Sequence, residues 1–393
     1  MGTLVLLESN TTGTGRLFAR AAVHLGHEPV LLAADPARYP YAADDGIRTE
    51  VIDTGDERAV LEACRRLGEV VGVTSSSEYF IAPAARVAAA LGLPGPDADA
   101  ITRCRDKERQ REALAAASVA VPRFAGASTV DDALAAAADI GYPVVLKPVA
   151  GSGSVGVRLC RDKEEAAEHA GALLAHTVNE RGIPVPARLL VEEVATGTEY
   201  SAEVFSGRVV GLVRKHLGDP PWFVEVGHDF PAPDDGLTAA VDRAVAALGL
   251  GFGPVHVELK ANGVIIEVNP RLAGGNIPEL VRHASGVDLV TESVRLVVGG
   301  LPHLDAIRRR HAAIRFLLPP TAGTLEAVHG LQEAAAVDGV VEVRVTKQPG
   351  DAVSRNGDFR DRIGHVLAVA DDGERARAAA EEARGRIVVE VAD

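Results

Sequence analysis

Residues 254–270 fix more of this chain's geometry than any other segment, because they contain a predicted β-hairpin. The dipeptide Asn262-Gly263 stands between two runs of alternating apolar residues. This arrangement is the strongest short-range signal for a tight hairpin turn. In the register that the turn sets, Glu258 directly faces Glu267 on the neighbouring strand. Two acids are therefore predicted to meet across one sheet.

Both acids share one face of the hairpin with His256 and Asn269, which also face each other, because side chains alternate along a strand. The other face is apolar and is predicted to enter the core: Val255, Val257, Leu259, Val264, Ile266 and Val268. Facing carboxylates with Cβ atoms about 5 Å apart repel each other. A hard divalent cation that takes oxygens from Glu258, Glu267, Asn269 and nucleotide phosphates would relieve that repulsion, which predicts a Mg²⁺ site. The alternative is a solvated polar face.

The first 95 residues predict a doubly wound parallel sheet, because short apolar strands alternate with alanine-rich helices. The loops at 9–15 and 75–78 follow two of these strands, at the edge where ligands of such sheets bind. Ordinary turn chemistry explains these loops equally well. The run Leu93–Asp97, with two prolines and a glycine, predicts a domain boundary.

Beyond this boundary the pattern changes to antiparallel strands and hairpins, and a third segment that mixes strands with helices begins near Gly299-Gly300. The sequence therefore predicts an α/β domain over 1–95, a central domain over 96–300 and an α+β domain over 301–393. Within these domains we expect helices at Thr102–Ala117 and Thr324–Gln332 and a strand at Val155–Leu159.

The charge and the cysteine content of the chain argue against several classes of partner and site. Lys and Arg number 41 against 55 Asp and Glu, a net charge of −14, so the overall field repels nucleic acid and anionic membranes. An anion such as ATP would need a local basic pocket and a metal cation. The three cysteines lack metal or disulfide spacing, and no signal peptide or membrane span is predicted, so we expect a cytoplasmic protein.

Residues 151–156 match the pattern G-x-G-x-x-G. A dinucleotide-binding loop would have to open a helix, whereas a strand is predicted here, and the Lys of a Walker A loop is missing. A flexible loop whose amides close over phosphates remains: Gly151, Ser152, Gly153 and Ser154. Lys147 ends the apolar strand before this loop, where its ammonium would meet phosphates or simply face solvent.

A second strand ends in acids and leads into a short linker that contains a glycine. Backbone groups near Glu193 and Ala195 could read the edge of an adenine, and Glu199 could accept hydrogen bonds from ribose hydroxyls. Taken alone, this segment would be an ordinary hairpin, and Lys107 in its charged helix would be a surface residue.

In chain order, these motifs resemble the ATP-grasp superfamily: Arg105-Asp106-Lys107, Val145-Leu146-Lys147 with the glycine loop, Glu192 through Glu199, and Glu258 through Arg271. The stretches 253–258, 269–278, 315–319 and 361–366 look most like its L-amino acid ligase branch, whose members make dipeptides. The resemblance implies an ATP-grasp architecture with a lid subdomain at about 122–194 and a metal and phosphate subdomain at about 195–300.

The resemblance also implies roles for single residues. Lys107 and Lys147 would hold ATP phosphates, and adenosine would be held by Glu192, Glu193, Ala195 and Glu199. One or two Mg²⁺ ions, which Mn²⁺ can replace, would bind Glu258, Glu267 and Asn269, and Arg271 would steady the transferred phosphoryl group and the oxyanion. Related D-alanine ligases carry an arginine at the place of His256, which leaves this histidine as a phosphate or substrate contact or as a structural residue.

A substrate carboxylate needs an anion site. Gly274, Gly275 and Asn276 precede a predicted helix whose free amides could supply it, although Asn276 could simply cap that helix. The segment 222–228, with the only tryptophan and His228, lines the same cavity or belongs to the core, and Glu78 is a further substrate candidate.

These roles imply an ATP-dependent ligase that forms an amide bond between small molecules, amino acids above all, through an acyl phosphate. The alternatives are an ATP-grasp ligase for other acids or amines, a kinase, or a non-catalytic nucleotide-binding regulator. The sequence leaves the oligomeric state open, a homodimer included.

Overall fold

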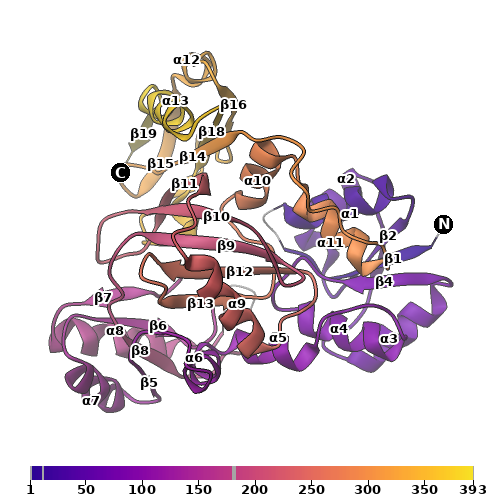
Figure 1. The fold of residues 1–393 in the computed structure, drawn as a ribbon, viewed down its shortest axis with the longest axis horizontal. Coiled ribbons are helices and arrows are strands. Elements are labelled where there is room, and N and C mark those ends of the chain that lie inside the picture. The colour runs from indigo at the N-terminus through magenta and orange to yellow at the C-terminus, as the bar shows by residue number, and fades with distance from the viewer. Residues whose placement is uncertain (1, 11–12, 179–182, 393) are drawn as a thin grey trace.

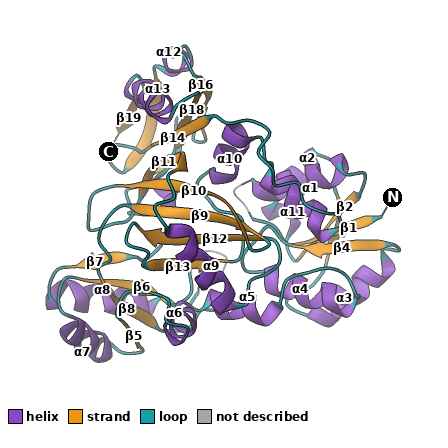
Figure 2. Ribbon diagram, in the orientation of Figure 1, coloured by secondary structure: helices purple, strands orange, loops and turns teal. Residues whose placement is uncertain are grey.

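The computed structural model describes residues 2–10, 13–178 and 183–392. Met1, and Thr11 and Thr12 of the predicted loop at 9–15, lie outside these residues. The fold consists of four sheets with flanking helices (Figures 1 and 2). In the described part of the chain no helix is both long and apolar enough to cross a membrane.

The N-terminal sheet is parallel throughout, with the strand order β3-β2-β1-β4, and so confirms the predicted doubly wound unit. Its strands are β1 (Thr3–Leu7), β2 (Glu28–Ala33), β3 (Arg48–Val51) and β4 (Val70–Thr74). Its helices are α1 (Thr14–His24), α2 (Pro40–Asp44), α3 (Glu57–Arg66) and α4 (Ile81–Ala90), with η1 at Pro36–Arg38. The two central strands, β1 and β2, are almost wholly buried, as expected for a parallel sheet covered on both faces.

A smaller antiparallel sheet, at the lower left of Figure 1, has the order β5-β8-β6-β7 and lies within the segment predicted as the lid, a name kept below for this sheet and its helices. Its strands are β5 (Phe124–Ala127), β6 (Val144–Pro148), β7 (Arg158–Cys160) and β8 (Leu189–Glu193), and its helices are α7 (Val130–Ile140) and α8 (Lys163–Ala175). The two helices pack on this sheet through alanine and leucine side chains. The glycine loop, residues 151–156, joins β6 to β7.

The central sheet has eight strands in the order β13-β12-β9-β10-β11-β14-β18-β16. Its strands are β9 (Glu199–Phe205), β10 (Arg208–Leu217), β11 (Glu225–Ala232), β12 (Pro254–Lys260), β13 (Ile265–Asn269), β14 (His311–Leu317), β16 (Val340–Val345) and β18 (Gly364–Ala370). The helices α9 (Leu237–Leu248), α10 (Ile277–Ser285) and α11 (Leu289–Val297) contribute to its apolar clusters.

The C-terminal region adds a three-stranded sheet, β17-β15-β19, at the top of Figure 1. Its elements are β15 (Gly323–His329), α12 (Leu331–Ala335), β17 (Ala352–Val353), η2 (Phe359–Asp361), α13 (Gly373–Gly385) and β19 (Val388–Ala392). Because β11 and β14 are paired, the central sheet draws strands from both sides of residue 300. The three-part division of the chain stays a prediction.

Three sequence-based expectations for single elements are wrong. The helix predicted at Thr102–Ala117 is two helices, α5 (Ala98–Arg105) and α6 (Lys107–Ala116), because Asp106 is extended and its carboxylate caps α6 by accepting the amides of Glu108 and Arg109.

The other two errors concern a strand and a helix. The segment 324–332 is mostly the strand β15, which alternates burial and pairs with β17 and β19, so tertiary pairing overrides the local helix signal. The strand predicted at Val155–Leu159 begins only at Arg158, because Val155 and Val157 donate their amides within successive tight turns of the glycine loop.

In the acidic hairpin, the predicted register is confirmed at both pairs of polar residues. Glu258 is paired with Glu267 and His256 with Asn269. A bulge then pairs Leu259 with Ile265, so Ile265 enters the core in place of the expected Val264 and Ile266. Ile266 lines the cleft instead.

The apolar face of this hairpin holds the acidic face in place, and its energetic weight can be measured. We expect Leu259→Ala, at a fully buried position, to lower the free energy of unfolding by about 2–5 kcal/mol. Leu301→Ala, at a position that is 83% exposed, is the matched control and should change it by less than about 0.5 kcal/mol. Urea unfolding followed by circular dichroism checks both, and equal losses would contradict this packing.

Candidate active site

A cavity of about 600 Å³ lies where the N-terminal sheet, the lid, the central sheet and the C-terminal region meet. All the site residues predicted from the sequence line it except His228. They come from segments far apart in the chain: Glu78; Lys107; Lys147, Gly151, Ser152, Gly153 and Ser154; Glu192, Glu193, Ala195 and Glu199; His256, Glu258, Glu267, Asn269 and Arg271; and Gly274, Gly275 and Asn276. The fold thus gathers the predicted residues, while their individual roles stay predictions.

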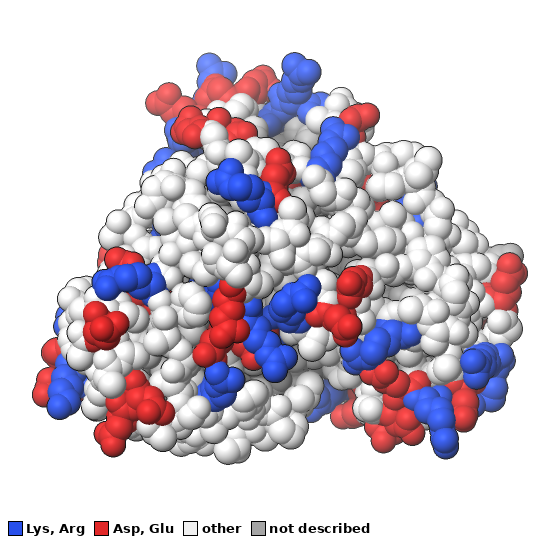
Figure 3. All heavy atoms as spheres, turned by 60° about the horizontal axis from the view of Figure 1, so that its bottom comes forward, with Lys and Arg blue, Asp and Glu red and all other residues white. Residues whose placement is uncertain are grey.

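Basic and acidic groups both line this cavity. The basic residues are Lys107, Lys147, Lys215, Lys260, Arg271, Arg344 and Arg362, and the acidic residues are Glu78, Glu192, Glu193, Glu199, Glu225, Glu258, Glu267 and Glu279. On the outer face shown in Figure 3, acidic and basic side chains are likewise interspersed. Among the described residues the expected local basic pocket is therefore not observed, because the seven basic residues stand among eight acidic ones.

The two facing acids of the hairpin are each held by a cation. Nζ of Lys107 lies 2.9 Å from Oε1 of Glu267, and Nζ of Lys215 lies 2.9 Å from Oε1 of Glu258. Burial alone would raise the pKa of Glu258, but Lys215 and His256 keep it below its usual range. Glu258 is therefore a carboxylate at neutral pH, and both acids line the cavity wall.

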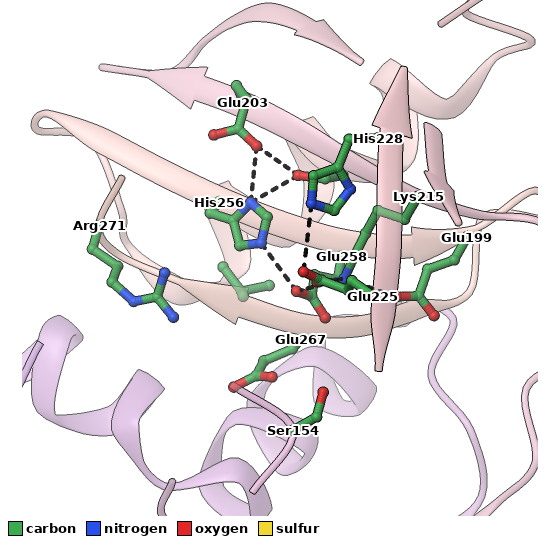
Figure 4. A network of polar contacts seen from close by, with 12 residues as sticks. Ser154, Glu199, Glu203, Lys215, Glu225, His228, His256, Glu258, Glu267 and Arg271 are labelled. Atoms are coloured by element: carbon green, nitrogen blue, oxygen red, sulfur yellow. Dashed lines mark hydrogen bonds and ion pairs between the residues drawn. The ribbon is translucent and has the colours of Figure 1, made fainter. Parts of the chain in front are cut away.

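Lys215 on β10 joins three carboxylates (Figure 4). Its Nζ lies 2.9 Å from Glu199, 2.8 Å from Glu225 and 2.9 Å from Glu258, and its side chain is 3% exposed. Burial alone would lower the pKa of Lys215, but the three carboxylates raise it well above the ordinary value. This buried ammonium therefore stays charged and fixes the predicted ribose and metal ligands relative to each other.

His256 bridges two acids. Its Nδ1 lies 2.8 Å from Glu203, its Nε2 lies 3.0 Å from Glu258, and the hydroxyl of Ser201 is 2.7 Å from Nδ1 (Figure 4). Burial opposes the charged form, but Glu203 and Glu258 outweigh it and raise the pKa of His256 to about 9. The histidine is thus an imidazolium that orients Glu258, which supplies a structural role within the site itself.

The donor set fits a hard divalent cation. Glu258 and Glu267 offer carboxylate oxygens and Asn269 offers an amide oxygen, all at the cavity wall. Within the described residues, no group of three His, Cys, Asp or Glu side chains could hold a metal ion unaided. A metal bound here would therefore take phosphate oxygens of a nucleotide to complete its coordination.

Lys147 belongs to a buried charge cluster. The carboxylate of Glu192 pairs with the ammonium of Lys147 and lies 2.7 Å from Nε of Arg111, whose side chain is fully buried. Burial, helped by the nearby Arg111, lowers the pKa of Lys147, and Glu192 limits that shift. Glu192 thus holds Lys147 at the cavity, and its predicted contact with adenosine stays a prediction.

Helix α6 ties the lid to the acidic hairpin. Lys107 at its first turn donates its amide to Val149 and its ammonium to the carbonyl of Gly151, both at 2.8 Å. Gln110, one turn later, exchanges two hydrogen bonds with the backbone of Val268. The break at Asp106 is what places this helix start, and hence Lys107, inside the cavity.

The remaining adenosine candidates differ in how firmly they are held. Glu199 is paired with Lys215 and, at 3.0 Å, with Lys260, so its carboxylate is fixed at the cavity wall. Glu193 is half-exposed and lies 3.5 Å from Arg123. Ala195 follows in the loop between β8 and β9, where its backbone lines the cavity.

Arg271 is held by the N-terminal domain. Its Nε lies 2.7 Å from Oε2 of Glu78, and the same oxygen is 3.1 Å from Arg105. Burial alone would raise the pKa of Glu78, but Arg271 and Arg105 lower it to about 2. Glu78, predicted as a substrate contact, is thus also the counter-ion that positions Arg271.

The predicted substrate turn adopts an unusual backbone. Gly275 and Asn276 have positive φ values of 59° and 57°, and the side chain of Asn276 does not cap α10 but contacts Nδ1 of His365 at 3.2 Å. Asn276 therefore occupies the N-cap position of α10, as predicted, but without a capping hydrogen bond from its side chain. The residues from Gly274 to Glu279, at the start of α10, line the cavity, and the amide of Ile277 donates to the carbonyl of Gly274 at 3.1 Å.

His228 lies behind that turn rather than on the cavity surface. The ring is fully buried, and among the described residues neither of its nitrogens has a hydrogen-bond partner. Its Nε2 is 3.5 Å from Glu225, and a Cβ on Gly275 would come within 2.6 Å of it. Burial lowers the pKa of His228, so the ring is neutral, and a direct contact with substrate stays a prediction.

Sequence reasoning missed Lys215, Glu225, Arg362 and Arg111. Lys215 lies within β10, and no motif in the neighbouring sequence marks it as a site residue. Glu225 pairs with Lys215 and Arg362, and these two cations hold its pKa well below the usual range against the effect of burial. Arg111 is a buried charge in a helix that looked exposed. The one available sign for Lys215 was that a charged residue stands at a strand position whose side chain points inward.

Family comparisons match two segments of the chain. Residues 140–279 match the family described as ATP-grasp domain. Residues 315–392 match the family described as L-amino acid ligase C-terminal domain 2. The first segment contains β6, β7 and β8 of the lid and the acidic hairpin, and the second contains the residues that line the cavity from the C-terminal region.

Three curated relatives are similar to this chain. The uncharacterized protein y4rH of Sinorhizobium fredii is 42% identical over 93% of this chain and 78% of its own length. Dapdiamide A synthase of Enterobacter agglomerans is 26% identical over 59% of this chain, and alanine–anticapsin ligase of Bacillus amyloliquefaciens is 30% identical over 59%. The chain covers only 58% and 56% of the length of these two enzymes.

Solved structures show the same fold. The L-amino acid ligase of Bacillus licheniformis matches with a TM-score of 0.80 at 22% identity, over 100% of this chain and 99% of that one. Phosphoribosylglycinamide synthetase of Anaerococcus prevotii matches with a TM-score of 0.72 at 21% identity, over 100% of both chains. At these identities the likeness concerns the fold alone.

The cluster around Lys147 makes a pH-dependent prediction. Glu192→Gln removes the carboxylate that supports the ammonium, so the pKa of Lys147 should fall further and Lys147 should lose its charge at lower pH. We expect the alkaline loss of ATP affinity to move down by about one pH unit or more. Binding of a fluorescent ATP analogue between pH 7 and 11 measures this. Glu164→Gln, on the exposed side of α8, is the control, and an equal shift in both would contradict the assignment.

Proposed function

We propose that this chain, which belongs to the ATP-grasp superfamily and carries an L-amino acid ligase C-terminal domain, is an ATP-dependent ligase. It would join the carboxyl group of one amino acid to the amine of another through an acyl phosphate. The observation that carries this proposal is the facing pair Glu258 and Glu267, set in a cavity with Lys107, Lys147 and Arg271.

The nucleotide would lie between the lid and the central sheet. Lys147 and Lys107 would meet its phosphates, and the amides of the glycine loop would cover them. Glu199 would accept hydrogen bonds from the ribose, and the backbone at Glu193 and Ala195 would contact the adenine. This placement is supported by the position of all these groups on one cavity.

One or two Mg²⁺ ions, or Mn²⁺, would bind Glu258, Glu267 and Asn269 and would neutralise charge on the phosphates when bound. Lys215 and His256 keep Glu258 ionised and oriented for this task. Lys107 contacts Glu267 at 2.9 Å, so its ammonium would be shared between that carboxylate and a phosphate. Positioning and charge neutralisation are the main needs of phosphoryl transfer.

In the first step, an oxygen of the substrate carboxylate forms a bond to the γ-phosphorus while the bond to the bridging oxygen of ADP breaks. Arg271, held by Glu78, would steady the negative charge of the transferred group. The products of this step are an acyl phosphate and ADP.

In the second step, the amine of the other substrate attacks the acyl carbon, phosphate leaves and the amine gives up a proton. Arg271 would again contact the developing oxyanion. Water would hydrolyse the acyl phosphate, so the glycine loop must stay closed during this step.

The non-reacting carboxylate of an amino acid would bind at the start of α10. Gly274, Gly275 and Asn276 form this turn, and helix amides at such a position attract anions. The neutral ring of His228 supports the turn from behind. The three free cysteines support a reducing, cytoplasmic location.

A matrix of amino-acid pairs, incubated with ATP and Mg²⁺ and read by phosphate release and product mass, tests this function. We expect phosphate release that requires an amine and yields an amide, and a loss of at least about a hundredfold in Glu258→Gln. Amine-independent phosphorylated product would indicate a kinase. The absence of turnover with every pair would overturn the dipeptide ligase and favour another ligase or a regulator.

A further inference from the structure

We propose that the loop Ser354–Arg362, here called the latch loop, holds the glycine loop closed over the nucleotide and thereby sets the rate of nucleotide release. The latch loop belongs to the C-terminal region, between β17 and β18, whereas the glycine loop belongs to the lid. The inference goes beyond the proposed function, because it concerns nucleotide exchange and not the substrates that are joined.

The first contact joins Phe359 to Gly153. The amide of Phe359 donates to the carbonyl of Gly153 at 3.2 Å. The ring lies so close that a Cβ on Gly153 would be 2.3 Å from Cδ1 of Phe359. Gly153 also has a φ of 64°, which favours glycine. The tip of the glycine loop is thus shaped to receive an aromatic ring from the C-terminal region, and both residues line the cavity.

A second contact lies beside the first. The ring of Trp222 packs on Gly357, where a Cβ would be 2.3 Å from Cγ of the indole. The segment around Trp222 is itself tied to the lid, because Leu159 donates its amide to Pro221 at 2.9 Å and Ser154 donates its hydroxyl to the carbonyl of Phe223 at 3.3 Å. The latch loop therefore contacts the lid directly at the glycine loop and indirectly, through Trp222, near β7.

The latch loop is organised to be rigid. The carboxylate of Asp361 accepts the amides of Asn356 and Gly357, both at 2.8 Å, and the hydroxyl of Ser354 at 3.3 Å. Asp361 itself is 2% exposed. Because the loop is folded around one buried carboxylate, Phe359 is held in a fixed place. The contact between Phe359 and Gly153 therefore does not require the loop to reorder each time the lid closes.

The loop is anchored at its other end to the cavity wall. Arg362 pairs with Glu225 and its guanidinium lies 4.2 Å from the ring centroid of Phe316. The anchor thus joins strands β11 and β14 of the central sheet, while the direct contact with the glycine loop consists of one partly exposed ring and one hydrogen bond. The weak side of this bridge is the lid side, which is where a latch must open.

Phe359→Ala tests the latch directly. We expect a fluorescent ADP analogue with Mg²⁺ to leave the variant about tenfold faster than the wild type in stopped-flow displacement, because the ring that holds Gly153 is gone. Trp222, the only tryptophan, should become more accessible to acrylamide quenching even without nucleotide. Phe124→Ala, which removes a comparable, partly buried ring from β5 of the lid, is the control.

Two further outcomes keep the test sharp. Phe359→Leu keeps an apolar side chain against Gly153 and should give an intermediate release rate, which a general loss of stability would not produce at an unchanged melting temperature. A wild-type release rate together with unchanged quenching in Phe359→Ala would overturn the latch. Lower ligase activity with an unchanged release rate would do so as well, because Phe359 would then act elsewhere. The release and quenching measurements require no amino-acid substrate.

Discussion

The like charges of Glu258 and Glu267, brought face to face across one hairpin, are the constraint on which the rest of the site depends. Their carboxylates cannot share this position without cations, and the fold supplies them from three directions. Lys107 comes from the helix before the lid, Lys215 from the central sheet, and His256 from the hairpin itself. The same need for positive charge makes the pair a fitting place for a metal that carries a nucleotide.

The cavity solves a wider electrostatic problem in the same way. A chain with a net charge of −14 repels ATP as a whole, so binding depends on single cations at the cavity. Nearly every one of these cations is buried beside an acid that keeps it in place. Lys147 depends on Glu192, Arg271 on Glu78, and Lys215 on three carboxylates. Pairs of this kind hold long side chains rigid, so the positive charge is positioned before the polyphosphate arrives. The cost is that removing any single acid leaves a buried cation without a partner.

The sequence was most informative where local chemistry sets geometry. Asn262-Gly263 was enough to predict that Glu258 meets Glu267, and the order of motifs was enough to predict the superfamily. Long-range partners were beyond its reach. Nothing near Lys215 in the chain shows that three distant acids surround it, and the helix start at Lys107 depends on a single cap, Asp106, inside a run that also suits a continuous helix. The strand β15 likewise exists because β19 pairs with it.

Metal binding in the presence of nucleotide tests the central claim most directly. Electron paramagnetic resonance can count Mn²⁺ bound to the protein with a non-hydrolysable ATP analogue, in the wild type and in Glu267→Gln. We expect the wild type to bind Mn²⁺ at the nucleotide and the variant to bind it at least about tenfold more weakly. Glu279→Gln removes a carboxylate from the same cavity wall and should bind like the wild type. Equal Mn²⁺ affinity in all three proteins would contradict the account.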